Sequence, residues 1–506
     1  MNAEAAYVFR HALLRDAAYQ LQLPGDRARL HALGIEAIEE LAGGRAPEPA
    51  ALDSWDAAAL SPHSTDPFAE ELAEHARLSQ EAGRVDLALR TRYLRRGAEH
   101  LEKSGNSEAS WRLWMQLGEA VRGVEKGEAL RRAGNLLFQS GQPKRAEPLL
   151  VESVARHRDA GDRRFLALAL RSLAVLCRQT GQVARAEEIY VEGLDISRDL
   201  GQKGLEGQIL SEMANLFTDT GRREEARKTF DQALATSRTA ADRTSEATIL
   251  GNQATLDLES GRFADAERGI EQGLALHREL GNRRAEGMMR GSLATVFWQS
   301  GRRGQAEEAH EVALVIHREV GNRRSEGVSL GDLANVYLVS GRVELAEQTY
   351  QQAIAIHREV GNRRFEGIVL SNLGSLCLES GRVREAEAHF EQAIAIHREV
   401  GNRRSEGLAL ENLAGVFHVT GRLEEAEKGF EEALSALTEV QDSRHLGIAL
   451  CESALLLLDR SRAGAARIRW RLGTASLRGL GKVTEMEPVL RAMQVACERA
   501  GVPPLA

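Results

Sequence analysis

Proline is almost absent from the middle of this 506-residue chain. Of its ten prolines, none lies between Pro148 and Pro488. Because proline removes a backbone donor and kinks or breaks a helix, this stretch is free of helix breakers. Aromatic residues are also scarce, at 5%, whereas hydrophobic residues make up 43%. Such a composition, rich in Ala, Leu, Glu and Arg, is typical of helices, so we predict an all-α fold.

Cysteine is scarce, and a net positive charge and long apolar runs are lacking. The four cysteines are scattered with no C-x-x-C pair, which favours buried filler over a disulfide or a zinc site. The net charge of -8 gives no indication of a nucleic-acid partner. Charged residues such as Glu4, Arg10 and Arg15 exclude a signal peptide, and the apolar run 454–458 is too short to span a membrane. We therefore expect a cytoplasmic protein with no membrane partner.

The chain does contain a regular period of forty residues. A glycine recurs at this interval, and an alanine follows each glycine by five residues. A stack of identical supersecondary units explains such a period, because each unit makes the same small-residue contact with its neighbour. The positions are Gly141, Gly181, Gly221, Gly261, Gly301, Gly341, Gly381 and Gly421, followed by Ala146, Ala186, Ala226, Ala266, Ala306, Ala346, Ala386 and Ala426.

One unit, residues 321–360, shows what is repeated. Apolar residues follow an i, i+3, i+4, i+7 pattern over 324–340, which predicts an amphipathic helix. Gly341 ends this helix in the left-handed conformation, and a second helix runs from Val343 to Gly361. Neither helix can cover its apolar face alone, so the helical hairpins must stack.

Within the unit, small and aromatic residues follow a recognisable order. It resembles the tetratricopeptide repeat (TPR), although the period is forty rather than about 34 residues and Arg358 replaces the closing proline. The longer form is similar to the repeats of kinesin light chains and of bacterial signalling ATPases. The resemblance implies a right-handed α-solenoid whose first helices line a concave groove for a peptide or protein partner. The matching residues are Leu333, Ala334, Tyr337, Ala346, Tyr350 and Ala353.

The N-terminal segment resembles a different family. Residues 9–13 (FRHAL) and 15–19 (RDAAY), followed by Leu30 and His31, look like the end of the ATPase module in bacterial STAND-type regulators. This resemblance implies a short winged-helix-like remnant ahead of the solenoid. The phosphate-binding loop G-x-x-x-x-G-K-S/T occurs nowhere, so we expect no cofactor, and a separate P-loop ATPase becomes a candidate partner.

These observations divide the chain into five regions. We expect a winged-helix-like remnant at 1–41, a linker at 42–67, an irregular helical transition at 68–120, eight TPR-like repeats at 121–440, and a degenerate repeat with capping helices at 441–506.

Polar residues at the groove positions of the first helices are the candidate partner-binding residues. Asparagine has two donors and an acceptor, so it can hold a peptide backbone without selecting a side chain, and it is a poor helix former. Ordinary solvated helix surface remains the alternative. The candidates are Asn215, Asn252, Trp298, Asn335, Asn372, Glu411, Asn412 and His418, together with Arg171.

Two further ladders run along the repeats. A basic rim could recognise an acidic ligand, or it could pair internally with the glutamates that flank it. The histidines His277, His317, His357 and His397 are about 8–10 Å apart from repeat to repeat, too far for one metal ion to bridge them. We expect them to pack against the next hairpin, and a pH-sensitive stack is the alternative. The rim consists of Arg283, Arg284, Arg323, Arg324, Arg363, Arg364, Arg403 and Arg404.

No catalytic or metal-binding constellation stands out. The G-x-S-x-G match at 327–331 lies inside a predicted helix, whereas a nucleophile elbow needs a strand-to-helix turn, so we interpret it as a chance match. The sequence favours a protein-interaction scaffold, or the sensor arm of a bacterial STAND-like signalling or transcription-regulatory system, rather than an enzyme. A self-associating structural scaffold is the second interpretation, and an uncharacterised enzyme the third.

Overall fold

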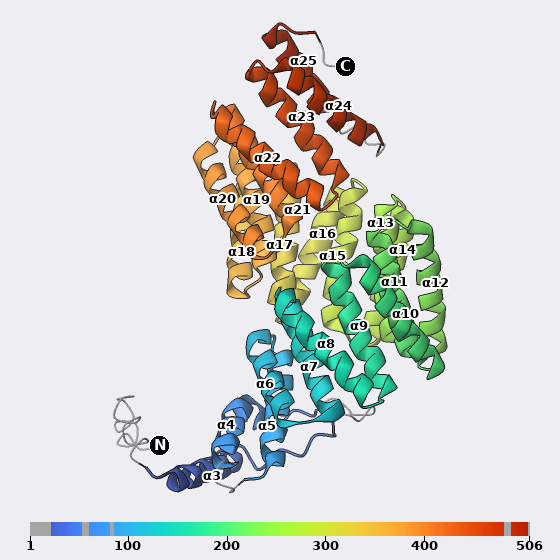
Figure 1. Ribbon diagram of the computed structural model, residues 1–506, viewed down its shortest axis with the longest axis vertical. Helices are drawn as coiled ribbons and strands as arrows, with labels where there is room; N and C mark the ends of the chain where they lie inside the picture. Colours follow the sequence, from blue (N-terminus) through green and yellow to red (C-terminus); the bar gives the residue numbers. More distant parts are fainter. Residues whose placement is uncertain (1–21, 53–59, 81–84, 480–486, 504–506) are drawn as a thin grey trace. The chain divides into compact units, whose positions relative to one another are not determined.

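The computed structural model describes residues 22–52, 60–80, 85–479 and 487–503, and all regular structure among them is helical (Figure 1). This confirms the predicted all-α solenoid of stacked helical hairpins. Residues 9–13 and 15–19, which suggested the winged-helix-like remnant, lie outside the described residues. None of the described helices is both long and apolar enough to cross a membrane.

Helix bounds repeat every twenty residues over most of the chain. From α7 to α24 each helix has 17 residues, and three residues separate it from the next. In chain order the elements are α3 (Pro24–Leu41), η1 (Asp66–Phe68), α4 (Ala69–Gln80), α5 (Leu87–Lys103), α6 (Ser107–Ala120), α7 (Gly123–Gln139), α8 (Pro143–Asp159), α9 (Arg163–Gln179), α10 (Val183–Asp199), α11 (Lys203–Asp219), α12 (Arg223–Thr239), α13 (Arg243–Glu259), α14 (Phe263–Glu279), α15 (Arg283–Gln299), α16 (Arg303–Glu319), α17 (Arg323–Val339), α18 (Val343–Glu359), α19 (Arg363–Glu379), α20 (Val383–Glu399), α21 (Arg403–Val419), α22 (Leu423–Glu439), α23 (Ser443–Asp459), α24 (Ala463–Gly479) and α25 (Glu487–Ala500).

The chain forms two compact units, Met1–Asn252 and Gln253–Ala506, and the boundary falls within α13. In the first unit α3 packs on α4, α4 on α5, α5 on α6 and α6 on α7, followed by the regular hairpins α7–α8, α9–α10 and α11–α12. In the second unit the hairpins α15–α16, α17–α18, α19–α20, α21–α22 and α23–α24 follow one another, and α25 packs on α23.

The described part of the expected linker, 42–52 and 60–67, packs against α5. Ala46 and Leu52 are buried. The buried guanidinium of Arg96 in α5 donates to Asp66 Oδ1 at 2.7 Å and to the Ser61 carbonyl at 2.9 Å. Because a buried charge is tolerated only when it is paired and hydrogen-bonded, these contacts fix the segment to the helix.

The repeated glycines end the helices as the sequence predicted. Gly341 has a φ of 77°, its N–H donates to the Leu338 carbonyl, and the Arg342 N–H donates to the Tyr337 carbonyl, each at 2.9 Å. This pair of hydrogen bonds is the Schellman motif, which satisfies carbonyls that a helix end would otherwise leave unpaired. The same left-handed position holds Ala241, Gln441 and Ser461, with φ of 53°, 54° and 58°.

Small residues let the two helices of a hairpin approach closely. Ala334 and Ala346 are fully buried, and a Cβ at Gly327 would lie 2.7 Å from the His357 ring. The histidine ladder was expected to pack against the next hairpin, but its tightest contact is with the first helix of its own hairpin. The next hairpin adds Phe365, whose ring centroid lies 5.7 Å from that of His357, and Asn362, whose Nδ2 lies 3.2 Å from His357 Nδ1. The expectation was incomplete because the glycine leaves a space that the imidazole fills.

Buried glutamates join successive hairpins. Glu326 in α17 is 3% exposed and accepts from Arg318 Nε of α16 at 2.8 Å and from Arg323 Nη1 of its own helix at 2.5 Å. One carboxylate thus ties the second helix of one hairpin to the first helix of the next. Equivalent pairs form at Glu286, Glu366 and Glu406.

Candidate functional site

The first helices of the hairpins form a continuous face within each unit. In the second unit α15 contacts α17, α17 contacts α19, α19 contacts α21 and α21 contacts α23, in addition to the contacts each makes with second helices. In the first unit α7 and α9, and α9 and α11, do the same. We call the surface that these first helices present away from the second helices the inner face. The candidate groove residues all lie on first helices.

Two of the candidate asparagines meet across adjacent hairpins. Asn372 Nδ2 of α19 donates to Asn335 Oδ1 of α17 at 3.4 Å. The same oxygen accepts from the Tyr350 hydroxyl of α18 at 2.5 Å. Asn335 therefore has a structural task, because it satisfies a hydroxyl on a fully buried tyrosine. Asn372 and the exposed Asn412 retain free hydrogen-bonding capacity, since each amide has more donors and acceptors than its contacts use.

The candidates in the first unit also bridge neighbouring first helices. Asn252 Nδ2 donates to Ser211 Oγ at 3.2 Å, and Arg171 donates to Gln208. Asn215 makes a longer contact, 3.5 Å, to Glu212 of its own helix. Polar side chains thus line this face as well, and they partly satisfy one another.

The C-terminal part of the inner face in the second unit is acidic. Glu411 is 7% exposed, and burial together with the charges of Glu452 and Asp442 raises its pKa well above the usual range. Burial raises the pKa of Glu452 to about 7. His418 lies beside this region and its Nε2 is 2.7 Å from Asp459 Oδ2. Trp298 is partly buried against the hydrophobic core, so it contributes less free surface than its sequence position predicted.

Sequence analysis missed two acidic members of this face. Asp332 and Glu452 occupy the same repeat position as Asn372 and Asn412, forty residues apart, so the period itself could have identified them. The Asp332 side chain reaches solvent, and desolvation by the surrounding protein raises its pKa to about 6. The inner face thus combines amides with carboxyls that protonate easily.

The basic rim divides into two sets. The first arginine of each pair is neutralised: Arg323 bonds to Glu326 at 2.5 Å and to Glu359 at 2.6 Å. Equivalent ion pairs form at Arg283, Arg363 and Arg403. The second arginines are exposed, and they are Arg284, Arg324, Arg364 and Arg404.

The G-x-S-x-G match does not form a nucleophile elbow in the structure. Ser329 of the G-x-S-x-G match is buried inside α17, so it cannot act as an exposed nucleophile. The four cysteines are free and buried, as expected of core filler. Within the described residues, no group of three His, Cys, Asp or Glu side chains is arranged to hold a metal ion.

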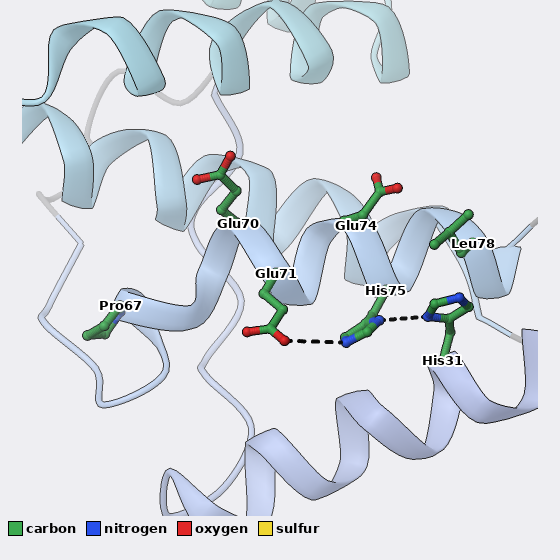
Figure 2. Close-up of a pocket in the computed structure, with 7 residues that line it drawn as sticks. All are labelled: His31, Pro67, Glu70, Glu71, Glu74, His75 and Leu78. Atoms are coloured by element: carbon green, nitrogen blue, oxygen red, sulfur yellow. Dashed lines mark hydrogen bonds and ion pairs between the residues drawn. The ribbon is translucent and has the colours of Figure 1, made fainter. Parts of the chain in front are cut away.

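A separate pocket of about 460 Å³ lies between α3 and α4 (Figure 2). His31 Nδ1 is 2.7 Å from His75 Nδ1, and His75 Nε2 is 3.8 Å from Glu71 Oε1. Burial and the nearby charge of His75 lower the pKa of His31. Two imidazoles and the carboxylates of Glu70, Glu71 and Glu74 supply proton acceptors, but the lining contains no hydroxyl or thiol nucleophile.

Comparisons with known proteins agree with this architecture. A model of the tetratricopeptide repeat family matches residues 125–199, 205–279 and 325–399, and a second model of that family matches 371–443. Together the matches cover more than half of the chain. No curated protein matches the chain.

Several solved structures are similar in fold. BtubC (BKLC) from P. vanneervenii is 21% identical, with a TM-score of 0.39 over 42% of this chain and 90% of that one. A Signal Transduction ATPase with Numerous Domains (STAND) protein with a tetratricopeptide repeat sensor, from Pyrococcus horikoshii, is 19% identical, with a TM-score of 0.47 over 71% of this chain and 53% of that one. A Rap protein complexed with competence and sporulation factor is 14% identical, with a TM-score of 0.49 over 74% of this chain and 99% of that one. At these identities and scores the similarity concerns the repeat fold alone.

Proposed function

The chain belongs to the tetratricopeptide repeat family, and from that membership we propose that it is a protein-binding scaffold whose inner face takes a peptide or protein segment. The observation that carries this proposal is the set of side-chain amides on consecutive first helices. Asn372 and Asn412 stand at the same repeat position on α19 and α21, and neither needs its full hydrogen-bonding capacity to hold the fold together. An amide in such a place can pair with the backbone of a bound segment.

The proposal extends to a biological setting. The sequence of residues 9–13 and 15–19 resembles the end of a STAND-type ATPase module, and the phosphate-binding loop is absent from the sequence. We place the protein as the sensor or scaffold arm of a bacterial STAND-like signalling or transcription-regulatory system. In that setting a P-loop ATPase is the candidate partner.

Replacing Asn372 and Asn412 together with alanine tests the inner face. We expect capture of partner proteins from lysate to fall at least about fivefold, because each lost hydrogen bond is worth about 0.5–1.5 kcal/mol. Asn335 is left intact, since its replacement would strip the buried Tyr350 hydroxyl of its acceptor.

A matched control is available on the other side of the hairpins. Gln351 and Gln352 are exposed amides on the second helix α18. Their replacement with alanine should leave capture unchanged, and both double variants should melt like the parent protein. If the α18 variant fails to capture the partner and the inner-face variant still captures it, the proposal that the inner face binds the partner is wrong.

A further inference from the structure

The two arginines of each repeated Asn-Arg-Arg turn differ in how their charges are paired. The first arginine of each turn is held between two carboxylates, as Arg323 is between Glu326 and Glu359. The second arginines are exposed and differ in their partners. Arg404 Nε pairs with Asp442 Oδ2 at 2.6 Å, whereas Arg284 reaches only the neutral Asn322 Oδ1 at 3.4 Å. Arg364 makes no ion pair or hydrogen bond with any residue that the structure describes.

The difference comes from the residue that caps the next first helix. Arg404 meets Asp442, the N-cap of α23, and Arg284 meets Asn322, the N-cap of α17. Asparagine and aspartate cap helices about equally well, and aspartate gains further from the helix dipole and from a neighbouring arginine. Folding alone thus favours aspartate at every turn. Asn322 and Asn402 instead keep their turns from supplying this carboxylate to Arg284 and Arg364.

Arg284, Arg324 and Arg364 form what we call the cationic row, because they occupy equivalent positions on α15, α17 and α19. Each sits at the start of its helix, where a positive charge opposes the helix dipole. Desolvation by the surrounding protein and the charge of Arg364 lower the pKa of Arg324, so neighbouring members of the row repel each other. These repulsions make the row unfavourable for the isolated protein. An anionic ligand that covered the row would relieve them.

We propose that the cationic row binds an extended acidic segment of a protein partner, with an acidic residue at about every third position. Consecutive first helices contact one another, so neighbouring arginines lie about one helix-packing distance apart, roughly 8–10 Å. An extended chain advances about 3.3 Å per residue and covers that distance in about three residues. This proposal rests on the proposed protein-binding function and specifies the chemistry of the segment.

The surroundings of the row favour an acidic peptide over nucleic acid. Glu319 and Glu359, which pair with Arg283 and Arg323, keep 55% and 57% of their side-chain surface exposed. The whole chain has a net charge of -8. A continuous polyanion would meet these carboxylates at every turn, whereas a peptide with spaced acidic residues can place neutral residues opposite them.

The test uses the full chain and a synthetic peptide of about twelve residues with glutamate at every third position, a length that spans about four repeats. Its matched control carries glutamine in place of glutamate. Calorimetric titration at low salt should show binding of the acidic peptide alone, and binding should weaken as salt screens the charges. Failure of the acidic peptide to bind, or equal binding of the glutamine peptide, overturns the proposal.

Substitutions at the caps locate the site without disturbing the fold. Asn322→Asp with Asn402→Asp supplies carboxylates to Arg284 and Arg364, and we expect a loss of about fivefold for each arginine. Asp442→Asn releases Arg404 from its partner and should strengthen binding. Asn362 is left unchanged because its Nδ2 lies 3.2 Å from His357 Nδ1. Unchanged affinity in the aspartate variant, at an unchanged melting temperature, overturns the assignment.

Two further comparisons distinguish this proposal from its alternatives. Tighter binding of single-stranded DNA than of the acidic peptide, with the same response to the cap variants, would assign the row to nucleic acid and overturn the proposal. If partner capture depends on Asn372 and Asn412 but not on the cap variants, the proposed function stands and this inference fails.

Discussion

Acid should destabilise this protein through its buried histidines. His357 and His397 have no exposed surface, and burial lowers the pKa of each to about 4 from the ordinary value of 6.5. Neither ring nitrogen of His397 has a hydrogen-bonding partner among the residues that the structure describes, and Gly367 lies against the ring. A protonated imidazole would therefore place an unsatisfied charge between two helices.

The direction in which stability changes with pH follows from the number of protons that each state binds. Between pH 6.5 and pH 4 the unfolded chain binds more protons at these histidines than the folded chain does, so stability falls as the pH falls through this range. The stabilisation that comes from keeping these histidines neutral is complete above pH 6.5 and is fully lost below pH 4. The difference corresponds to about 3 kcal/mol for each histidine.

Replacing both histidines with leucine isolates this effect. Leu437 occupies the equivalent position of the next repeat and packs on Gly407, so the fold already accommodates leucine there. Going from pH 7 to pH 4.5, the variant should avoid about 5 kcal/mol of the loss that the parent protein suffers.

Amide hydrogen exchange is the suitable assay, because repeat arrays open locally and exchange reports each helix separately. The amides of α18 and α20, corrected for intrinsic rates, should lose less protection in acid in the leucine variant than in the parent protein. Helix α22 contains no histidine and is the internal control. Equal loss of protection in parent and variant would refute the reasoning.

Three further predictions follow from the turns and the sequence. Replacing Ala241, Gln441 or Ser461 with glycine should raise the free energy of unfolding by about 1 kcal/mol each, because these residues hold positive φ values; urea denaturation measures it, and no gain would argue against strain at these turns. Gly327→Ala should cost about 1–3 kcal/mol, since its Cβ would lie 2.7 Å from the His357 ring, and the cost should shrink when His357 is also alanine; an equal cost in both backgrounds would place the clash elsewhere. Calorimetry with ATP and ADP should detect no binding at micromolar concentrations, because the sequence has no phosphate-binding loop, and saturable binding would reveal a missed nucleotide site.

The periodic part of the fold could be predicted almost completely from the sequence. The first helix expected at 324–340 is observed at Arg323–Val339, because apolar spacing and the turn glycine both define its ends. The left-handed turns at Ala241, Gln441 and Ser461 were not predicted, since nothing in an alanine, glutamine or serine indicates a positive φ. The signal lies instead in the repeat period, because glycines with positive φ occupy the equivalent turns.

The candidate site was predicted less well, because its side chains depend on residues far apart in the sequence. Asn335 was a candidate partner-binding residue, and its structural task could not be predicted, because it accepts from a tyrosine fifteen residues later. The two arginines of each turn looked equivalent, yet one lies between carboxylates and the other faces the next helix cap. That difference depends on the path of the following hairpin, which adjacent residues do not encode.

The central claim, that a protein segment binds along the inner face, can be tested directly by site-specific photo-crosslinking. A photoreactive residue at Asn412, which is exposed on α21, should form a covalent adduct with the partner captured from lysate. The same group at Gln352, which is exposed on α18, should form none. Adducts at Gln352 and their absence at Asn412 would contradict the account.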